Sequence, residues 1–342
     1  MEDNKAVLST LLENLLGSER AHRLFGLLTV PPALLAETGV RISRAGIAQA
    51  LNMMLFEDLL NRVPDAAAYA ADRIRDGIKV MHDHGAVRTV ALRGMGSLPA
   101  GEEAITRILR ALGYTLNAVY PLERLKMTGR SHVQSDYPEE LAQFFISELH
   151  PERFSFEFQA AAQRVTASSR DPLTPAAKAF LIQLEQTGSL SVEDAGALLP
   201  ALSACFSRQH EAAAVADYES LLAESPEMAW IATEGNAFNH ATDRVADVDQ
   251  VAEEQKQLGR PMKATVETSQ SGRVRQTAFL AARVTRRFRA EDGSIVQKEV
   301  PGSFYELITR LPLPAEDGRK LDLSFDSSNA QAIFKMTAGA GR

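Results

Sequence analysis

The sequence contains few of the features that usually define a function class. Its 342 residues include one cysteine, Cys205, which excludes an internal disulfide and a cysteine-rich zinc site. Aromatic residues make up only 6% of the chain, whereas alanine, a strong helix former, is abundant. No apolar run is long enough to cross a bilayer, so we expect no association with membranes.

Long runs of one charge are also missing. The chain has 37 Lys and Arg against 44 Asp and Glu, a net charge of −7. Since nucleic-acid-binding proteins usually present a basic face, we expect no nucleic-acid partner. The first residues, Met1-Glu2-Asp3-Asn4-Lys5, lack the basic and apolar regions of a signal peptide, which predicts a cytoplasmic protein. The composition predicts no particular oligomeric state.

Two parts of the chain are expected to be helical. In residues 1–82 apolar side chains recur at three- and four-residue spacing, and we interpret this region as an N-terminal scaffold. In residues 151–228, Thr174-Pro175 is typical of a helix start, and Ser191 begins a sequence like a capping box. This second region is predicted to be a helical insert.

The remaining segments, 83–150 and 229–342, show the same order of predicted elements. The first is expected to contain a strand, a helix and three more strands, at 84–92, 101–112, 114–120, 124–133 and 144–149. The second is expected to repeat this pattern at 238–245, 247–258, 264–270, 274–289 and 295–311, with a further strand at 230–233 and a C-terminal closing segment. We therefore predict an α+β fold in which paired β-α-β-β-β units form a cupped sheet.

Three polar residues occupy corresponding places in these units. His84 and His240 fall on the first strand of each unit, and Glu306 falls on the last strand of the second. Two histidines and one carboxylate form the ligand set of a non-haem iron(II) site with open positions. The same ligands accept other divalent metals, so the sequence alone does not identify the ion.

The pattern resembles the vicinal-oxygen-chelate, or glyoxalase-like, superfamily, in which such strands supply metal ligands. Three motifs further resemble the 2-oxoadipate dioxygenase/decarboxylase family, and they span about residues 80–340: His84-Gly85-Ala86-Val87-Arg88, Asn239-His240-Ala241-Thr242-Asp243-Arg244 and Phe304-Tyr305-Glu306. The resemblance implies that His84, His240 and Glu306 bind Fe(II) and that Arg88 serves the substrate.

The resemblance also implies a reaction. The substrates would be O2 and a 2-oxo dicarboxylic acid, with 2-oxoadipate giving 2-hydroxyglutarate and CO2. No separate 2-oxoglutarate would be needed, because the substrate is itself a 2-oxo acid. The chain is shorter than the better-studied members of the family, so neither the substrate's length nor the stereochemistry of the product follows from the sequence.

Substrate contacts are expected from two arginines and one serine. The two-residue period of a strand places Arg88 on the side of His84, and Arg244 on the side of His240. A guanidinium can bind a carboxylate with two hydrogen bonds. Arg244 is equally expected in a structural ion pair. Ser328, in Ser327-Ser328-Asn329, is predicted to cap the cavity.

Other interpretations of these residues stay open. A single histidine on a strand is more often a packed core residue than a ligand. For a buried Glu306, the structural alternative to a metal is a pair with Arg310. Glu148 is a candidate fourth ligand, which would favour a glyoxalase-type isomerase or lyase. A third alternative is a protein that binds small molecules without catalysis and without metal.

Overall fold

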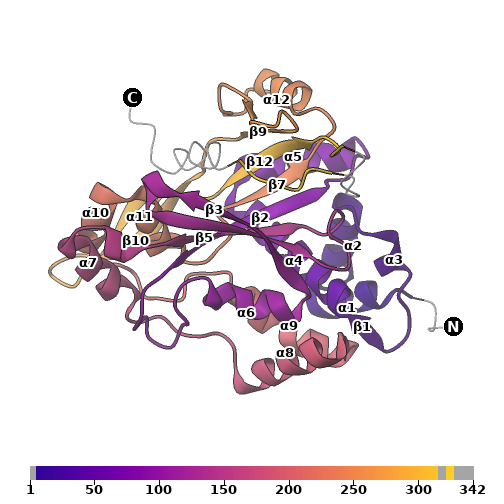
Figure 1. The fold of residues 1–342 in the computed structure, drawn as a ribbon, viewed down its shortest axis with the longest axis horizontal. Coiled ribbons are helices and arrows are strands. Elements are labelled where there is room, and N and C mark those ends of the chain that lie inside the picture. The colour runs from indigo at the N-terminus through magenta and orange to yellow at the C-terminus, as the bar shows by residue number, and fades with distance from the viewer. Residues whose placement is uncertain (1–4, 315–320, 327–342) are drawn as a thin grey trace.

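The centre of the protein is a mixed sheet. The computed structural model describes residues 5–314 and 321–326, and in these residues eight strands form the sheet in the order β3-β4-β5-β2-β7-β12-β9-β8 (Figure 1). The strands are β2 (His82–Val90), β3 (Tyr114–Leu122), β4 (Met127–Gln134), β5 (Gln143–Leu149), β7 (His240–Arg244), β8 (Glu267–Thr268), β9 (Val274–Ala278) and β12 (Phe304–Arg310).

The sheet consists of two halves with the same internal order. The first half runs β3-β4-β5-β2 and the second β8-β9-β12-β7, so that β2 and β7 meet in the middle as an antiparallel pair. In each half a helix follows the central strand, α6 (Glu103–Ala111) in the first and α12 (Val248–Gln257) in the second. The predicted α+β fold of paired β-α-β-β-β units is therefore confirmed.

The contact between the halves is centred on Gly85, which pairs with Ala241. Every residue of β2 is buried, so the strand is covered on both faces. A Cβ atom at Gly85 would lie 2.3 Å from the Phe238 ring, a distance that no side chain tolerates. Glycine at this position therefore allows the close approach of Phe238 to the middle of the sheet.

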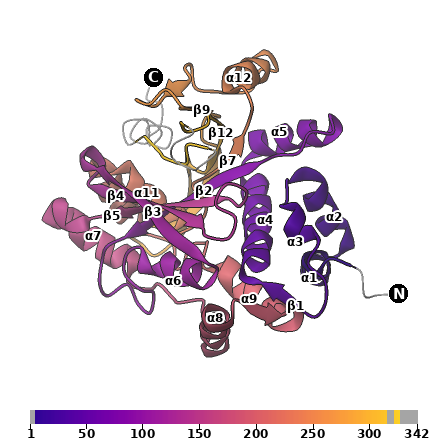
Figure 2. The same ribbon diagram turned by 45° about the vertical axis from the view of Figure 1, so that its right-hand side comes forward.

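Helices surround the sheet, and Figure 2 shows the N-terminal group of them beside α4. In the described residues none of the helices is long and apolar enough to cross a membrane. A short two-stranded sheet, β1 (Arg41–Ser43) with β6 (Ser189–Ser191), joins the N-terminal region to the later helices. The helices are α1 (Val7–Leu16), α2 (Ser18–Leu27), α3 (Pro32–Leu35), α4 (Arg44–Arg62), α5 (Pro64–Arg75), α7 (Phe156–Thr166), α8 (Pro175–Thr187), α9 (Val192–Ala204), α10 (Val215–Glu224) and α11 (Pro226–Glu234), with 3-10 turns at Glu123–Leu125 and Pro151–Arg153.

The predicted helix starts at Thr174 and Ser191 are confirmed. The Thr174 hydroxyl accepts from the Ala177 amide at 3.1 Å, and the Ser191 hydroxyl accepts from the Asp194 amide at 3.0 Å. The division of the chain into four segments, by contrast, stays a prediction.

The strand predicted at 230–233 is wrong, because these residues lie in α11. The Ser225 hydroxyl accepts from the Met228 amide at 3.2 Å, and Pro226 occupies the first helical position. Ser225-Pro226 is thus the same start signal as Thr174-Pro175. All residues of α11 except the half-buried Pro226 are buried, so apolar periodicity does not distinguish a helix from a strand here.

The long strands predicted at 274–289 and 295–311 are each divided in two. Their inner parts, β9 and β12, belong to the main sheet, whereas β10 (Arg283–Arg289) and β11 (Ile295–Pro301) form a separate hairpin. Exposed and half-buried residues alternate along β10 up to the buried Phe288. The Phe288 ring packs on the Tyr218 ring, with 4.8 Å between the ring centroids. One face of this hairpin is therefore solvated, unlike the fully buried β12.

Candidate metal centre

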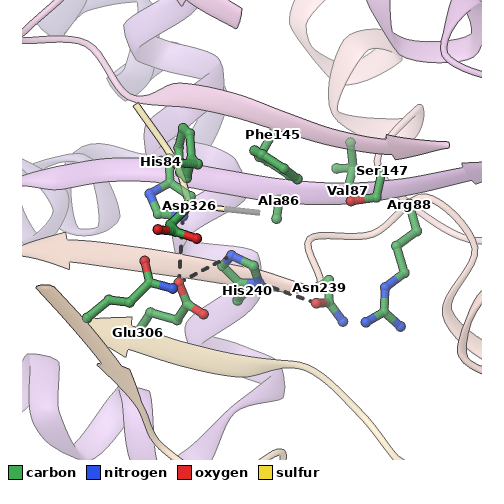
Figure 3. Close-up of a pocket in the computed structure, with 12 residues that line it drawn as sticks. His84, Ala86, Val87, Arg88, Phe145, Ser147, Asn239, His240, Glu306 and Asp326 are labelled. Atoms are coloured by element: carbon green, nitrogen blue, oxygen red, sulfur yellow. Dashed lines mark hydrogen bonds and ion pairs between the residues drawn. The ribbon is translucent and has the colours of Figure 1, made fainter. Parts of the chain in front are cut away.

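The three predicted ligands come together on neighbouring strands in the middle of the sheet. The register places Thr242 of β7 opposite His84 of β2 on one side and opposite Glu306 of β12 on the other. His240 lies two residues before Thr242 and so points to the same face. Figure 3 shows the two imidazoles and the carboxylate directed at one another.

The distances between the side chains are those of a shared site. Glu306 Oε2 lies 3.4 Å from His240 Nε2 and 3.6 Å from His84 Nε2. One candidate ligand atom from each residue lies within 4.8 Å of the others, and all three residues are buried. The Thr242 hydroxyl donates to Glu306 Oε2 at 3.2 Å and so helps to hold the carboxylate.

The outer ring nitrogens of both histidines already have partners. His84 Nδ1 lies 2.8 Å from Asp83 Oδ1, and His240 Nδ1 lies 3.3 Å from Asn239 Oδ1. An oxygen at Nδ1 fixes the tautomer with the proton on Nδ1, which leaves the Nε2 lone pair for a metal. Each ligand histidine is thus oriented by the residue that precedes it.

The chemistry of Glu306 also fits a metal ligand. Its Oε1 atom is buried and has no hydrogen-bond partner among the residues that the structure describes. A buried carboxylate oxygen without a partner is costly, and a cation would satisfy it. The predicted structural alternative, a pair of Glu306 with Arg310, is wrong because Arg310 bonds Asp83.

The two histidines differ in their electrostatics. Burial disfavours a charged His84, but the Asp83 and Glu306 carboxylates outweigh this and raise its pKa. Burial lowers the pKa of His240 to about 4, against the opposing effect of Glu306. The pKa of Glu306 is itself lowered, since the two imidazoles outweigh its burial. His240 is therefore neutral at physiological pH and ready to act as a ligand.

A cavity opens beside these side chains. Polar side chains and two phenyl rings line the cavity, and Figure 3 shows these residues. The cavity is lined by His84, Ala86, Val87, Arg88, Phe145, Ser147, Asn239, His240, Gln276, Glu306, Phe325 and Asp326.

Arg88 lies in the cavity wall on the same face of β2 as His84, as the strand period predicts. Its guanidinium lies over the Trp230 ring, 5.0 Å from the centroid, and its backbone oxygen accepts from the Asn236 side chain at 2.7 Å. Burial lowers the pKa of Arg88 to about 10, partly offset by the charge of Glu227. Arg88 therefore stays a cation, held beside the candidate metal centre.

The other expected residues lie elsewhere. Arg244 donates to Asp83 at 2.6 Å and does not line the cavity, which agrees with the structural alternative. Glu148 accepts from Arg130 at 2.8 Å and does not belong to the His-His-Glu group, so the structure does not support it as a fourth ligand. Ser328 lies outside the described residues.

Asp83 and Phe325 are the site residues that sequence reasoning missed. Asp83 is fully buried between the buried His82 and His84, and its carboxylate receives two arginines. A carboxylate inside an otherwise buried strand is a recognisable signal of a functional or structural ion pair, because a buried charge needs a partner. Phe325 follows the last predicted strand in Leu321-Asp322-Leu323-Ser324-Phe325-Asp326, where apolar and polar residues alternate; this alternation is a signal that could have marked Phe325 as partly buried.

Comparisons with known proteins agree with this geometry. A sequence model of the 2-oxoadipate dioxygenase/decarboxylase family matches residues 51–336. No curated protein matches the chain. A Ralstonia eutropha JMP134 structure assigned provisionally to the glyoxalase superfamily is 54% identical, with a TM-score of 0.88 over 94% of this chain and 98% of that one.

Two more distant structures share the fold. Hydroxyglutarate synthase from Oryza sativa, solved with 2-oxoadipate, is 19% identical and has a TM-score of 0.68 over 92% of this chain and 96% of that chain. The Pseudomonas putida hydroxyglutarate synthase is 18% identical, with a TM-score of 0.61 over 87% of this chain and 75% of that chain. At these identities the similarity establishes the fold alone.

Proposed function

Because the chain belongs to the 2-oxoadipate dioxygenase/decarboxylase family, we propose that it is an iron(II)-dependent enzyme acting on a 2-oxo dicarboxylic acid. The proposed reaction converts 2-oxoadipate and O2 to 2-hydroxyglutarate and CO2, in which both atoms of O2 enter the products. One observation carries the proposal: a buried His-His-Glu group faces a cavity whose wall also holds a buried arginine.

The ligand set supports this chemistry. His84, His240 and Glu306 would hold the metal through three ligands, which leaves positions open for a chelating 2-oxo acid and for O2. Bound iron(II) would supply the activation of O2 that drives loss of C1 as CO2. Phe145 and Phe325 line the cavity, with Phe325 packed on His84, and would shield this end from bulk water.

Arg88 would bind the far carboxylate of the substrate. It lies four residues after His84 on β2, which separates the two Cα atoms by about 13 Å along the strand. The metal and the guanidinium thus occupy different parts of one cavity, as a molecule with an acid at each end requires. The planar guanidinium suits a carboxylate better than an ammonium would.

The glyoxalase-type alternative receives no support from the geometry. It needs a fourth protein ligand, but Glu148 is engaged by Arg130 and the backbone amide of Glu102. In the register of β5 on β2, Phe145 occupies the place that corresponds to Glu306 in the second half. A phenyl ring there cannot coordinate a metal.

The decisive experiment is anaerobic loading with iron(II), followed by O2 uptake across a panel of 2-oxo acids. We expect O2 consumption and CO2 release in equal amounts with 2-oxoadipate, without added 2-oxoglutarate. A folded His240→Ala protein should lose both its metal and its turnover. Turnover that continues unchanged without O2 would refute the dioxygenase and favour an isomerase or lyase.

A further inference from the structure

The segment Leu321–Asp326 crosses the candidate metal centre, and we call it the cover. The Phe325 ring packs edge-on against the His84 imidazole, with 4.8 Å between the ring centroids, and lies 4.9 Å from Phe145. The Phe325 amide donates to the Tyr120 hydroxyl at 3.1 Å. The cover therefore forms part of the cavity wall directly beside a candidate ligand.

Arg310 fastens the cover to the sheet. Its side chain is fully buried, and its Nη1 atom donates to the backbone oxygens of Asp322 at 2.9 Å and Ser324 at 2.7 Å. The guanidinium also lies 4.9 Å from the centre of the Phe325 ring. One buried cation thus holds three residues of the cover.

The remaining donors of Arg310 bind Asp83. Arg310 Nε and Nη2 each lie 2.9 Å from an oxygen of this carboxylate, and Asp83 Oδ1 also bonds His84 Nδ1 at 2.8 Å. Arg310 and Arg244 outweigh the burial of Asp83 and hold its pKa well below the usual range. A continuous chain of hydrogen bonds therefore runs from the cover through Arg310 and Asp83 to His84.

We propose that Asp83 and Arg310 are positioning residues that couple the His84 imidazole to the cover, so that metal binding and closure of the cavity stabilise each other. The inference rests on the metal site of the proposed function. A carboxylate on the outer nitrogen orients a ligand imidazole and increases its basicity. Because coupling between two binding events is reciprocal, whatever orients His84 for the metal also stabilises the cover.

A second arginine offers a matched control. Arg244 donates to Asp83 at 2.6 Å, as Arg310 does, but its other donor binds the backbone oxygen of Glu139 at 2.8 Å. Both arginines therefore neutralise the same carboxylate, and Arg310 is in addition bonded to the backbone of the cover. Lysine retains the charge but lacks the planar set of five donors.

The first test uses the wild-type protein with cobalt(II) as the probe metal. Hydrogen exchange of the Phe325 amide is measured with and without cobalt, and binding is followed by the visible absorption of the ion. We expect cobalt to slow this exchange at least tenfold. Absence of cobalt binding would overturn the metal site of the proposed function. Cobalt binding without slower exchange would overturn the coupling alone.

The second test compares Arg310→Lys with Arg244→Lys. Arg310→Lys should weaken cobalt binding by up to about tenfold, the lower end of the effect of losing an outer partner, because Arg310 holds Asp83 and Asp83 in turn holds His84. It should also change the cobalt absorption spectrum and speed exchange at Phe325, whereas Arg244→Lys should leave that exchange at the wild-type rate. Equal effects of the two variants on exchange would overturn the proposal. Should Arg310→Lys not fold, the wild-type comparison decides.

Discussion

The two halves of the sheet have the same topology but different side chains at corresponding positions. In the register around the Gly85–Ala241 pair, His84 corresponds to His240, and Arg88 to Arg244. The partner strands extend the correspondence, because Phe145 pairs with Ala86 just as Glu306 pairs with Thr242. The backbone is thus repeated, whereas the site built on it is not.

The differences divide the tasks between the halves. The second half supplies two candidate ligands, His240 and Glu306, whereas the first supplies His84 and the arginine that faces the cavity. The residue before each histidine differs as well: Asp83 is charged and Asn239 is neutral. A symmetric frame brings the strands together, and the side chains that differ on it distribute the candidate ligands and the cavity arginine unequally between the two halves.

The largest effect is expected from removing Glu306, the carboxylate that the second half contributes to the candidate metal centre. Glu306→Gln should reduce metal affinity by more than the roughly hundredfold expected for loss of an outer partner, because a direct ligand is lost. Glu148→Gln, on the last strand of the other half, is the matched control and should bind metal normally. Titration of both variants with iron(II) under anaerobic conditions measures the difference, and equal affinities would exclude Glu306 as a ligand.

The next largest effect is expected on kcat/KM when Arg88 is replaced. Arg88→Ala should retain its metal and lose roughly ten- to a hundredfold in kcat/KM, because a hydrogen bond to a charged group contributes about 1.5–3 kcal/mol. Arg88→Lys should recover only part of this loss.

Binding of the substrate at Arg88 can also be measured without turnover. Trp230, the only tryptophan of the chain, lies under Arg88, so its fluorescence should report occupancy of the guanidinium in the wild-type protein. Normal kcat/KM in Arg88→Ala would exclude Arg88 as the carboxylate anchor. Because Arg244 does not line the cavity, Gln276 or Asn239 would then be the next polar groups to test.

A smaller effect is expected where the halves meet. Gly85→Ala forces a methyl group into the Phe238 ring and should lower the free energy of unfolding by about 1–3 kcal/mol. Its counterpart Ala241→Gly only removes a buried methyl and adds backbone freedom, which costs about 1 kcal/mol. Urea denaturation of both variants checks the order, and a harmless Gly85→Ala would contradict the close packing at this position.

The smallest effect on metal affinity is expected at Asn239, the hydrogen-bond partner of the His240 ring. Asn239→Ala removes a long, neutral hydrogen bond of 3.3 Å to His240 and should weaken metal binding by roughly two- to tenfold. Asp83→Asn, in the other half, should weaken it more, because it also leaves two arginines without their carboxylate. Isothermal titration with cobalt(II) compares them, and a larger loss in Asn239→Ala would reverse the assignment.

Much of the fold was predictable because it depends on local patterns. The apolar spacing of the early helices, the Thr174-Pro175 start and the repeated β-α-β-β-β order all follow from neighbouring residues. The positions of His84, His240 and Glu306 followed from that order combined with the family motifs. These three residues come together because β2, β7 and β12 are neighbours in the middle of the sheet, and the repeated pattern indicates which strands are central.

The errors arose where burial or long-range contacts decide the structure. In α11 every residue after Pro226 is buried, so periodicity could not separate helix from strand. The β10–β11 hairpin continues the apparent strand pattern of β9 and β12, and its separation from the main sheet depends on long-range packing such as that of Phe288 on Tyr218. A pair of Arg310 with Glu306 was the structural alternative to a metal ligand, but Arg310 bonds the buried Asp83 carboxylate instead.

The location of the candidate metal centre across the junction of the halves has a consequence for folding. His84 lies in the first third of the sequence and Glu306 in the last, so a bound ion would act as a cross-link that closes a very long loop. The ligands converge only after β2 and β7 have docked, so tight metal binding should be a late event in folding. Chelation should consequently lower the melting temperature of the whole sheet, and apoprotein should unfold faster than the metal-loaded form.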